Sequence, residues 1–330
     1  MTMLEVLAIL AGLAAQTPNP GPRDTLRILA VGDINLGRRL AKDHLEKGDT
    51  LFPFRAVMDS LASGDVLFGN LESPIAPDSH VVESAGIKFT APILAAAALA
   101  RAGFVIVSTA NNHAWDGGPR GVVETMNRLS EQGVRFVGSG FGRAMAEQPV
   151  ILERRGWRIG FFAVTRAWNP APDNFYGHAG ARYIAWGDPA WLYPAIKALK
   201  ASGLVDLVVV SVHGGREYSA EPRPSYQHFL EGLADAGADL VLAHHPHVLQ
   251  PVIYRHGTPI VQSLGNFVFS QAEPWTRLGA ILRITVAPDH KISIRAIPVR
   301  AGYQVTFADS TAADSVCARL GVSLSNRMKR

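Results

Sequence analysis

The chain of 330 residues is poor in cysteine, in charge and in long hydrophobic runs, and each absence excludes a class of protein. Cys317 is the only cysteine, which excludes an intramolecular disulfide and any zinc or iron–sulfur site built on several thiolates. Charged residues make up 18% of the sequence and hydrophobic residues 48%, a balance that excludes intrinsic disorder. A chain of this length can bury a large core without covalent cross-links.

The basic residues are dispersed along the chain. The formal net charge is +4, and the denser basic groups stand at 38–39, 154–155 and 327–330. A nucleic-acid-binding protein typically carries a basic stripe with interleaved aromatic residues, and none is present. We therefore expect a mildly basic soluble surface and no nucleic-acid partner.

An uncharged apolar run, VLAILAGLAA, occupies residues 6–15 and is followed by a polar, proline-rich stretch to residue 23. The run is too short to span a bilayer but has the length of a signal-peptide core. No Lys or Arg precedes it, and Glu5 stands where positive charge is usual. We expect residues 1–25 to be a signal peptide or N-terminal anchor with a linker, and the protein to be exported to the cell envelope or beyond. A cytoplasmic amphipathic start is the alternative.

Short β-branched runs alternate with helical stretches, which favours an α/β fold of βαβ units. We expect strands at 26–31, 65–68, 104–107, 135–137, 206–212 and 239–243, and a hairpin at 150–164. Helices are expected at 92–102, 121–132, 189–201 and 226–236. Strands at 259–263, 280–287 and 292–299 are typical of an antiparallel meander. Two mixed sheets packed together, with helices outside, fit this order best, and residues 26–330 are expected to form one domain.

Five of the expected strands end in loops that carry metal-ligand residue types. These loops contain Asp33 with Asn35, Asn70 with Glu72, Asn111 to His113, His213, and three histidines at 244–247. The carboxyl ends of strands in an α/β sheet converge on one crevice. Oxygen and imidazole ligands together suit Mn, Fe or Zn. A carboxylate shared by two such cations holds them about 3.5–4 Å apart, which can activate a water.

Taken alone, most of these residues have an ordinary structural explanation. Asp33 after a glycine could cap a turn, Asn112 could form a turn, and His113 could be a surface histidine. The three histidines at 244–247 are the strongest local signal, because polar rings are costly directly after a buried strand.

Six segments carry these residues in a fixed order: VGDINLGR (31–38), GNLESPI (69–75), STANNHAWDGG (108–118), VHGGREYSAEP (212–222), AGADLVLAHHPHVLQP (236–251) and SLGNFVFSQ (263–271). In these segments the sequence resembles the CapA family of bacterial poly-γ-glutamate capsule biosynthesis proteins. That family is a branch of the calcineurin-like metallophosphoesterase superfamily. The resemblance covers nearly the whole chain after residue 26.

The resemblance implies a four-layer αββα sandwich with a site for two divalent metal ions at the sheet ends. It places Asp33 on the first metal. Glu72, helped by Asn70, takes the position of the carboxylate that bridges the two metals.

The remaining implied ligands come from the later segments. Asn112 and His213 would bind the second metal, and His245 and His247 would supply one imidazole to each. His244 and His245 could exchange roles, because the sequence does not fix which ring faces inward.

The resemblance also assigns catalytic roles and reveals departures. His113 would be the general acid, oriented by Asp116, since imidazoles titrate near neutral pH. Asn35 replaces the histidine of the superfamily's first motif, and Asn70 replaces the aspartate of its second; CapA relatives share both features. Gly214 stands where relatives usually have Trp, which would open one wall of the pocket.

Two main functions follow from this resemblance; a nucleic-acid phosphodiesterase is a third and weaker alternative, because the sequence has no basic stripe. One is a metal-dependent hydrolase of a phosphoester or of a polymer amide bond. The other is a non-catalytic accessory protein that binds poly-γ-glutamate or its membrane synthase during export. A basic chain suits a polyanionic polymer, and Lys88, Arg166, Arg216 and Arg223 lie in or near the loops of the expected site.

Overall fold

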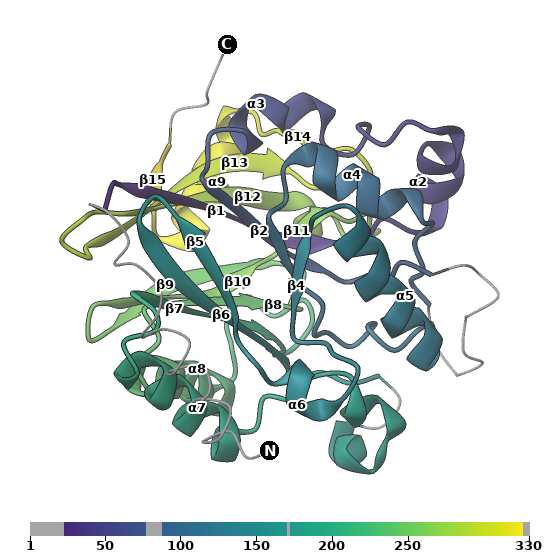
Figure 1. Cartoon of the computed structure of the whole chain (residues 1–330). Helices are drawn as coiled ribbons and strands as arrows, with labels where there is room; N and C mark the ends of the chain where they lie inside the picture. The colour runs from purple at the N-terminus through teal and green to yellow at the C-terminus, as the bar shows by residue number, and fades with distance from the viewer. Residues whose placement is uncertain (1–22, 77–87, 170–171, 326–330) are drawn as a thin grey trace.

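The computed structural model describes residues 23–76, 88–169 and 172–325 (Figure 1). The apolar run at 6–15, on which the expected signal peptide or anchor rests, lies outside the described residues. None of the helices within the described ranges is both long enough and apolar enough to cross a membrane.

The first sheet joins a parallel half to an antiparallel half. Its strands are β1 (Leu26–Ile34), β2 (Val66–Leu71), β3 (Ile106–Ser108), β4 (Arg135–Val137), β11 (Asn266–Val268), β12 (Leu278–Val286), β13 (Ile292–Arg300), β14 (Thr306–Phe307) and β15 (Ser323–Leu324). Over the described residues the order is β14-β13-β12-β1-β2-β3-β4, with β11 paired to β1 and β15 to β13. β1 to β4 are parallel, and β12 joins β1 antiparallel.

The second sheet is parallel in its centre and antiparallel at both edges. Its strands are β5 (Val150–Arg154), β6 (Trp157–Thr165), β7 (Leu207–His213), β8 (Leu240–His244), β9 (Leu249–Arg255) and β10 (Thr258–Leu264). They lie in the order β5-β6-β7-β8-β10-β9. The edge strands β5 and β9 each pair antiparallel with the strand beside them in sequence.

Helices cover the outer faces of both sheets, whereas buried side chains of the C-terminal helix join the core between the sheets (Figure 1). The helices are α2 (Arg38–Asp43), α3 (Met58–Leu61), α4 (Leu94–Ala102), α5 (Gly118–Glu131), α6 (Arg143–Ala146), α7 (Pro189–Ala201), α8 (Pro224–Asp235) and α9 (Ser310–Leu320). Short 3-10 helices span Leu45–Lys47, Arg55–Val57, Pro172–Gly177, Ala179–Arg182 and Pro274–Arg277. Buried side chains of α4 pack on the first sheet, and those of α7 and α8 pack on the second.

Side chains alternate between the two faces of each strand, and this alternation produces the layers. In β1, Ile28 and Ala30 join the core between the sheets, whereas Leu29 and Val31 join the core beneath the outer helices. Both faces of β1 are covered, which is why it reads as a continuous apolar run. Phe68 of the first sheet stacks on Phe161 of the second, with ring centroids 5.8 Å apart. The fold is therefore the expected αββα sandwich of two mixed sheets.

Two of the three strands expected in a C-terminal antiparallel meander are confirmed, and the placement of the third is wrong. β12 and β13 form an antiparallel pair, but the strand expected at 259–263 is β10, which belongs to the second sheet. There it pairs parallel with β8 and antiparallel with β9, a strand that the sequence reading missed. The chain then returns to the first sheet through β11, which lies beside β1.

Candidate metal centre

The carboxyl ends of strands from both sheets meet at one place. Asp33 at the end of β1 lies in register with Asn70 of β2, and His213 at the end of β7 lies in register with His244 of β8. All four side chains are buried. The topology therefore gathers residues that are up to 211 positions apart, as expected from the convergence of strand ends.

Asp33 is held from several directions. Its Oδ1 accepts a hydrogen bond of 2.8 Å from the Asn70 amide nitrogen, and its Oδ2 accepts one of 3.2 Å from the His245 backbone N–H. His247 Nδ1 lies 3.3 Å from Oδ2. Burial would raise the pKa of Asp33, but the imidazoles of His244 and His247 outweigh it and hold that pKa well below its ordinary value. In this arrangement Asn70 directs a donor at Asp33 and positions its carboxylate.

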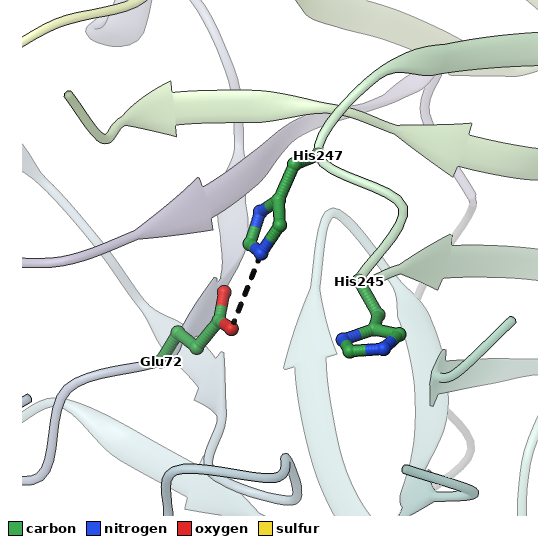
Figure 2. Close-up of side chains that lie close together, drawn as sticks. All are labelled: Glu72, His245 and His247. Atoms are coloured by element: carbon green, nitrogen blue, oxygen red, sulfur yellow. Dashed lines mark ion pairs between the residues drawn. The ribbon is translucent and has the colours of Figure 1, made fainter. Parts of the chain in front are cut away.

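Glu72 follows β2 and is completely buried. Its Oε1 lies 3.7 Å from His213 Nε2 and 3.8 Å from His247 Nε2. Figure 2 shows the carboxylate and the His247 ring pointing toward each other, with His245 beside them. Burial and the nearby charge of Asp33 raise the pKa of Glu72 well above its ordinary value.

His213 makes contacts that fit a neutral ring. Its Nε2 lies 2.8 Å from the Asn112 side-chain oxygen, and its Nδ1 lies 3.1 Å from the Asn70 amide nitrogen. A neutral imidazole with its proton on Nε2 donates to the first and accepts from the second. Burial, reinforced by the neighbouring His245, lowers the pKa of His213 well below 6.5. The neutral ring is the form that ligates metals.

The loop after β8 carries His244, His245 and His247. His245 and His247 have φ values of 94° and 58°, in the left-handed region that residues other than glycine rarely adopt. Burial lowers the pKa of His245 to about 3. Burial would also lower the pKa of His247, but the charges of Glu72 and Asp33 outweigh it and raise that pKa to about 9.

These residues fit a divalent cation. Asp33, Glu72 and His213 form one group whose potential ligand atoms lie within 4.8 Å of one another; Glu72, His245 and His247 form a second. Both Glu72 oxygens and His245 Nδ1 are buried without a hydrogen-bond partner among the described residues. Each such atom costs about 1–3 kcal/mol, a cost that coordination would remove. The mixed carboxylate and imidazole donors suit Mn, Fe or Zn.

The two groups divide the ligands differently from the resemblance. His245 and His247 stand together with Glu72, whereas the resemblance gives one imidazole to each metal. Glu72 is common to both groups. His244 belongs to neither group; its Nδ1 lies 3.5 Å from Asp33 Oδ1, and its ring lies near Phe68.

His113 and Asp116 form a buried pair beside this centre. His113 Nδ1 lies 2.8 Å from Asp116 Oδ2, which also accepts a 2.6 Å bond from the Phe89 backbone N–H. The Phe89 ring lies 3.9 Å, centroid to centroid, from the His113 ring. Lys88 Nζ is 3.8 Å from the other Asp116 oxygen. The ring is thus fixed at Nδ1.

The sequence reading missed two asparagines that connect this site. Asn169 accepts a 2.8 Å bond from the Asn112 amide, and its own amide nitrogen lies 3.5 Å from His113 Nε2. Asn266, in register with Asp33 on β11, places its side-chain oxygen 2.9 Å from His247 Nδ1. Asn266 lies within the segment SLGNFVFSQ, whereas no sequence signal marks Asn169.

Two departures from the superfamily pattern have structural explanations. The Asn35 side chain accepts a 3.0 Å bond from the Gly37 N–H, so it caps a turn and does not join the cluster. Gly214 does not open the pocket wall, contrary to expectation. A Cβ at this position would lie 3.1 Å from the Tyr226 ring and 3.1 Å from the Arg166 side chain, which fill the space.

Comparison with known proteins identifies relatives. A family model described as bacterial capsule synthesis protein PGA_cap matches residues 27–271. The PGA biosynthesis protein CapA of Bacillus subtilis is 32% identical over 77% of this chain and 65% of its own length. The capsule biosynthesis protein CapA of Bacillus anthracis is 31% identical over 84% of this chain and 68% of its own length. A probable polyglutamine synthesis accessory protein of Mycobacterium tuberculosis is 26% identical over 74% of this chain and 68% of its own length. The match thus spans about two thirds of these relatives.

Proposed function

Because the chain belongs to the PGA_cap family of bacterial capsule synthesis proteins, a family linked to poly-γ-glutamate, we propose that it is a metal-dependent hydrolase acting in capsule synthesis. One observation carries the proposal: a buried group of carboxylates and imidazoles whose Glu72 oxygens and His245 Nδ1 lack partners among the described residues. Buried polar atoms without partners are rare unless a ligand completes them.

Asp33, Glu72, His213, His245 and His247 would hold two divalent ions, and Glu72 belongs to both groups of potential ligands. When bound, such ions neutralise negative charge on the substrate and lower the pKa of water toward 7. Around them, Asn70 and Asn266 keep Asp33 and His247 in place. The buried walls exclude bulk water and strengthen these electrostatic contacts.

His113 would deliver a proton to the leaving group from Nε2. Its Nδ1 faces Asp116, which holds the ring in place, and Phe89 restricts the orientation of the ring. Asn169 lies near Nε2 and accepts a hydrogen bond from Asn112, whose side-chain oxygen lies close to His213 Nε2. Asn169 therefore connects the proton donor to one of the metal ligands. The bond cleaved would be a phosphoester or an amide of the polymer.

Metal content per chain, measured by plasma mass spectrometry on protein purified without chelators or nickel, tests this function. We expect about two Mn, Fe or Zn ions per chain in the wild type. Asp33→Ala and His245→Ala should both lose metal, while His44→Ala, on a histidine outside the site, should not. A wild-type protein that binds no metal after reloading would refute the dinuclear mechanism.

The second candidate is an accessory protein that binds poly-γ-glutamate or its synthase. The name of the Mycobacterium tuberculosis relative favours it, as does a basic cavity beside the site, described below. Polymer binding without turnover by metal-loaded protein would support this role. For either function we propose export to the cell envelope, guided by the apolar run at 6–15.

A further inference from the structure

A cavity of about 540 Å³ lies against the segment that carries Phe89. One wall is α2 with the turn that follows it, residues 38–46, and the other is residues 88–94 at the start of α4. The comparisons assign no role to this cavity, and none of the expected metal ligands lines it.

The cavity is basic. Arg38, Lys42 and Lys88 line it, against the single carboxylate of Glu46. Arg38 and Lys42 are exposed and have no ion-pair partner in the part of the chain that the structure describes. They stand four positions apart, at the start and near the end of the short helix α2, and both line the cavity.

The cavity adjoins the metal centre. Lys88 contacts Asp116, the partner of His113. The Arg38 guanidinium lies 5.7 Å from the centre of the Phe89 ring, whose other contacts are His113 and Phe269. The cations therefore form a series that begins beside His113 and continues outward along α2.

The backbone around Arg38 is fixed in an unusual conformation. Arg38 has a φ of 57°, and a Cβ at the preceding Gly37 would lie 2.1 Å from the Thr90 carbonyl oxygen. This close approach joins the two walls of the cavity. Strained backbone of this kind persists where the surrounding structure over-determines it, commonly at binding sites.

The part of the second wall at the start of α4 is apolar and open to solvent. Ile93 and Leu94 line it and are 44% and 39% exposed, large values for aliphatic side chains in a folded protein. A ligand that fits this cavity carries repeated negative charges on a partly aliphatic backbone.

We propose that the cavity binds the carboxylates of an acidic polyamide, successive units contacting Lys88, Arg38 and Lys42 while the next unit enters the metal centre. The proposal rests on the proposed function in that the polymer is the same. A γ-linked glutamyl chain has one carboxylate per unit and methylenes between them. The methylenes pack on Ile93 and Leu94, and the carboxylates pair with the cations.

Fluorescence anisotropy of a labelled γ-linked oligoglutamate, titrated with the full chain, tests the proposal. Arg38→Gln/Lys42→Gln should weaken binding about tenfold and reduce its salt dependence, because two charge contacts are lost. The matched control is Arg39→Gln/Lys47→Gln, which removes the same charge from the same stretch outside the cavity. The control should change the affinity by less than about twofold. Lys42→Gln alone, at an exposed position, should weaken binding about threefold and guards against misfolding of the double variant.

Three outcomes decide the matter. Equal affinities of the cavity variant and the control would overturn the proposal. Stronger competition by inorganic phosphate or polyphosphate than by unlabelled oligoglutamate would assign the cavity to phosphate and also overturn it. Oligoglutamate binding by His245→Ala that still depends on Arg38 and Lys42 would support the cavity even if the hydrolase function failed.

Discussion

Asp33 and Glu72 are two completely buried carboxyl groups in one cluster. The pKa of Asp33 is lowered, whereas the pKa of Glu72 is raised. Two adjacent carboxylates cannot both ionise at low cost in a buried place. Asp33 has the imidazoles and hydrogen-bond donors, so it keeps the charge. Glu72 has no hydrogen-bond donor among the described residues, so its proton is favoured until a cation replaces it.

Metal binding should therefore release protons. His247, with a pKa of about 9, is protonated at neutral pH in the metal-free protein and must lose its proton to become a ligand. The pKa of Glu72 is also raised, and because the charge of Glu72 is the main cause of the raised pKa of His247, the two groups share this proton. His245, with a pKa of about 3, and Asp33, with its lowered pKa, contribute none. We expect release of about one proton at neutral pH, and an affinity that rises with pH toward 9.

Calorimetric titration of the metal-free protein with Mn²⁺, in buffers of different ionisation enthalpy, counts these protons. His247→Gln should release about one fewer. A binding enthalpy that does not change with the buffer would contradict the expected protonation of His247.

His113 should matter most when the leaving group is poor. His113→Gln should lower kcat about 10²- to 10⁴-fold for a phosphodiester with an alkyl leaving group, since the proton donor is lost. For a nitrophenyl leaving group, which needs little protonation, the loss should be much smaller. Asp116→Asn should lower kcat about 10- to 100-fold through misorientation of the ring.

Metal content measured alongside separates this role from ligation. Both variants should keep the metal content of the wild type, because neither residue belongs to the two ligand groups. An equal loss for both leaving groups would rule out proton donation by His113.

Residue types at strand ends could be predicted from the sequence, but contacts between distant loops could not. Potential ligands stand at or just after the ends of buried strands, a pattern that the sequence alone shows: Asp33, Glu72, His213 and the histidines at 244–247. Asn169 lies 57 positions from Asn112, and only the packing of the two sheets brings them together. The contact between Tyr226 and Gly214 also depends on packing. The Tyr226 ring comes from a helix outside the sheet, so the sequence around Gly214 does not predict it.

At the scale of elements, β1 approaches the loop before β11 so closely that only glycine fits. A Cβ on Gly32 would lie 2.0 Å from the Gly265 carbonyl oxygen. Gly32→Ala should therefore force the two segments apart and destabilise the fold by about 1–3 kcal/mol or more. It should also weaken metal binding, since Asp33 is the next residue. Urea unfolding and metal content measure the two effects.

Gly121→Ala in α5 is the matched control. The nearest atom to its new Cβ would be the Ala76 Cβ at 3.6 Å, an ordinary contact. The variant should be as stable as the wild type or about 0.5–1 kcal/mol more stable, because alanine favours a helix. Equal stability of the two variants would show that the approach of β1 to Gly265 is not tight.

Elements that have a local sequence pattern could be predicted from the sequence. The sheet to which a strand belongs could not, because it depends on pairing with distant strands. The helix at 189–201 was predicted with its observed bounds, because Asp188 caps it and Pro189 begins it. The strand at 259–263 was identified as a strand and given to the wrong sheet. Its apolar pattern is the same in either sheet, and its partner β9 contains a proline that weakens the strand signal.

At the scale of the whole molecule, the candidate ligands come from both sheets. Asp33 and Glu72 belong to the first, and His213, His245 and His247 follow strands of the second. A cation held by these residues would have ligands from both sheets, and both sheets must stay packed for those ligands to converge. Unfolding of either sheet disperses the site.

Chelation should consequently lower the stability of the entire chain. A ligand present at one hundred times its Kd stabilises the native state by about 2.7 kcal/mol, which for a chain of this size corresponds to roughly 4 °C in Tm. Differential scanning calorimetry, with Mn²⁺ and with a chelator, should show this difference as a shift of one transition, since the metal joins the two sheets. His245→Ala should have the lower Tm in both conditions, which separates loss of the metal from an effect of the chelator itself. Two transitions, of which only one responds to metal, would mean that the sheets unfold independently and that the cation stabilises only one of them.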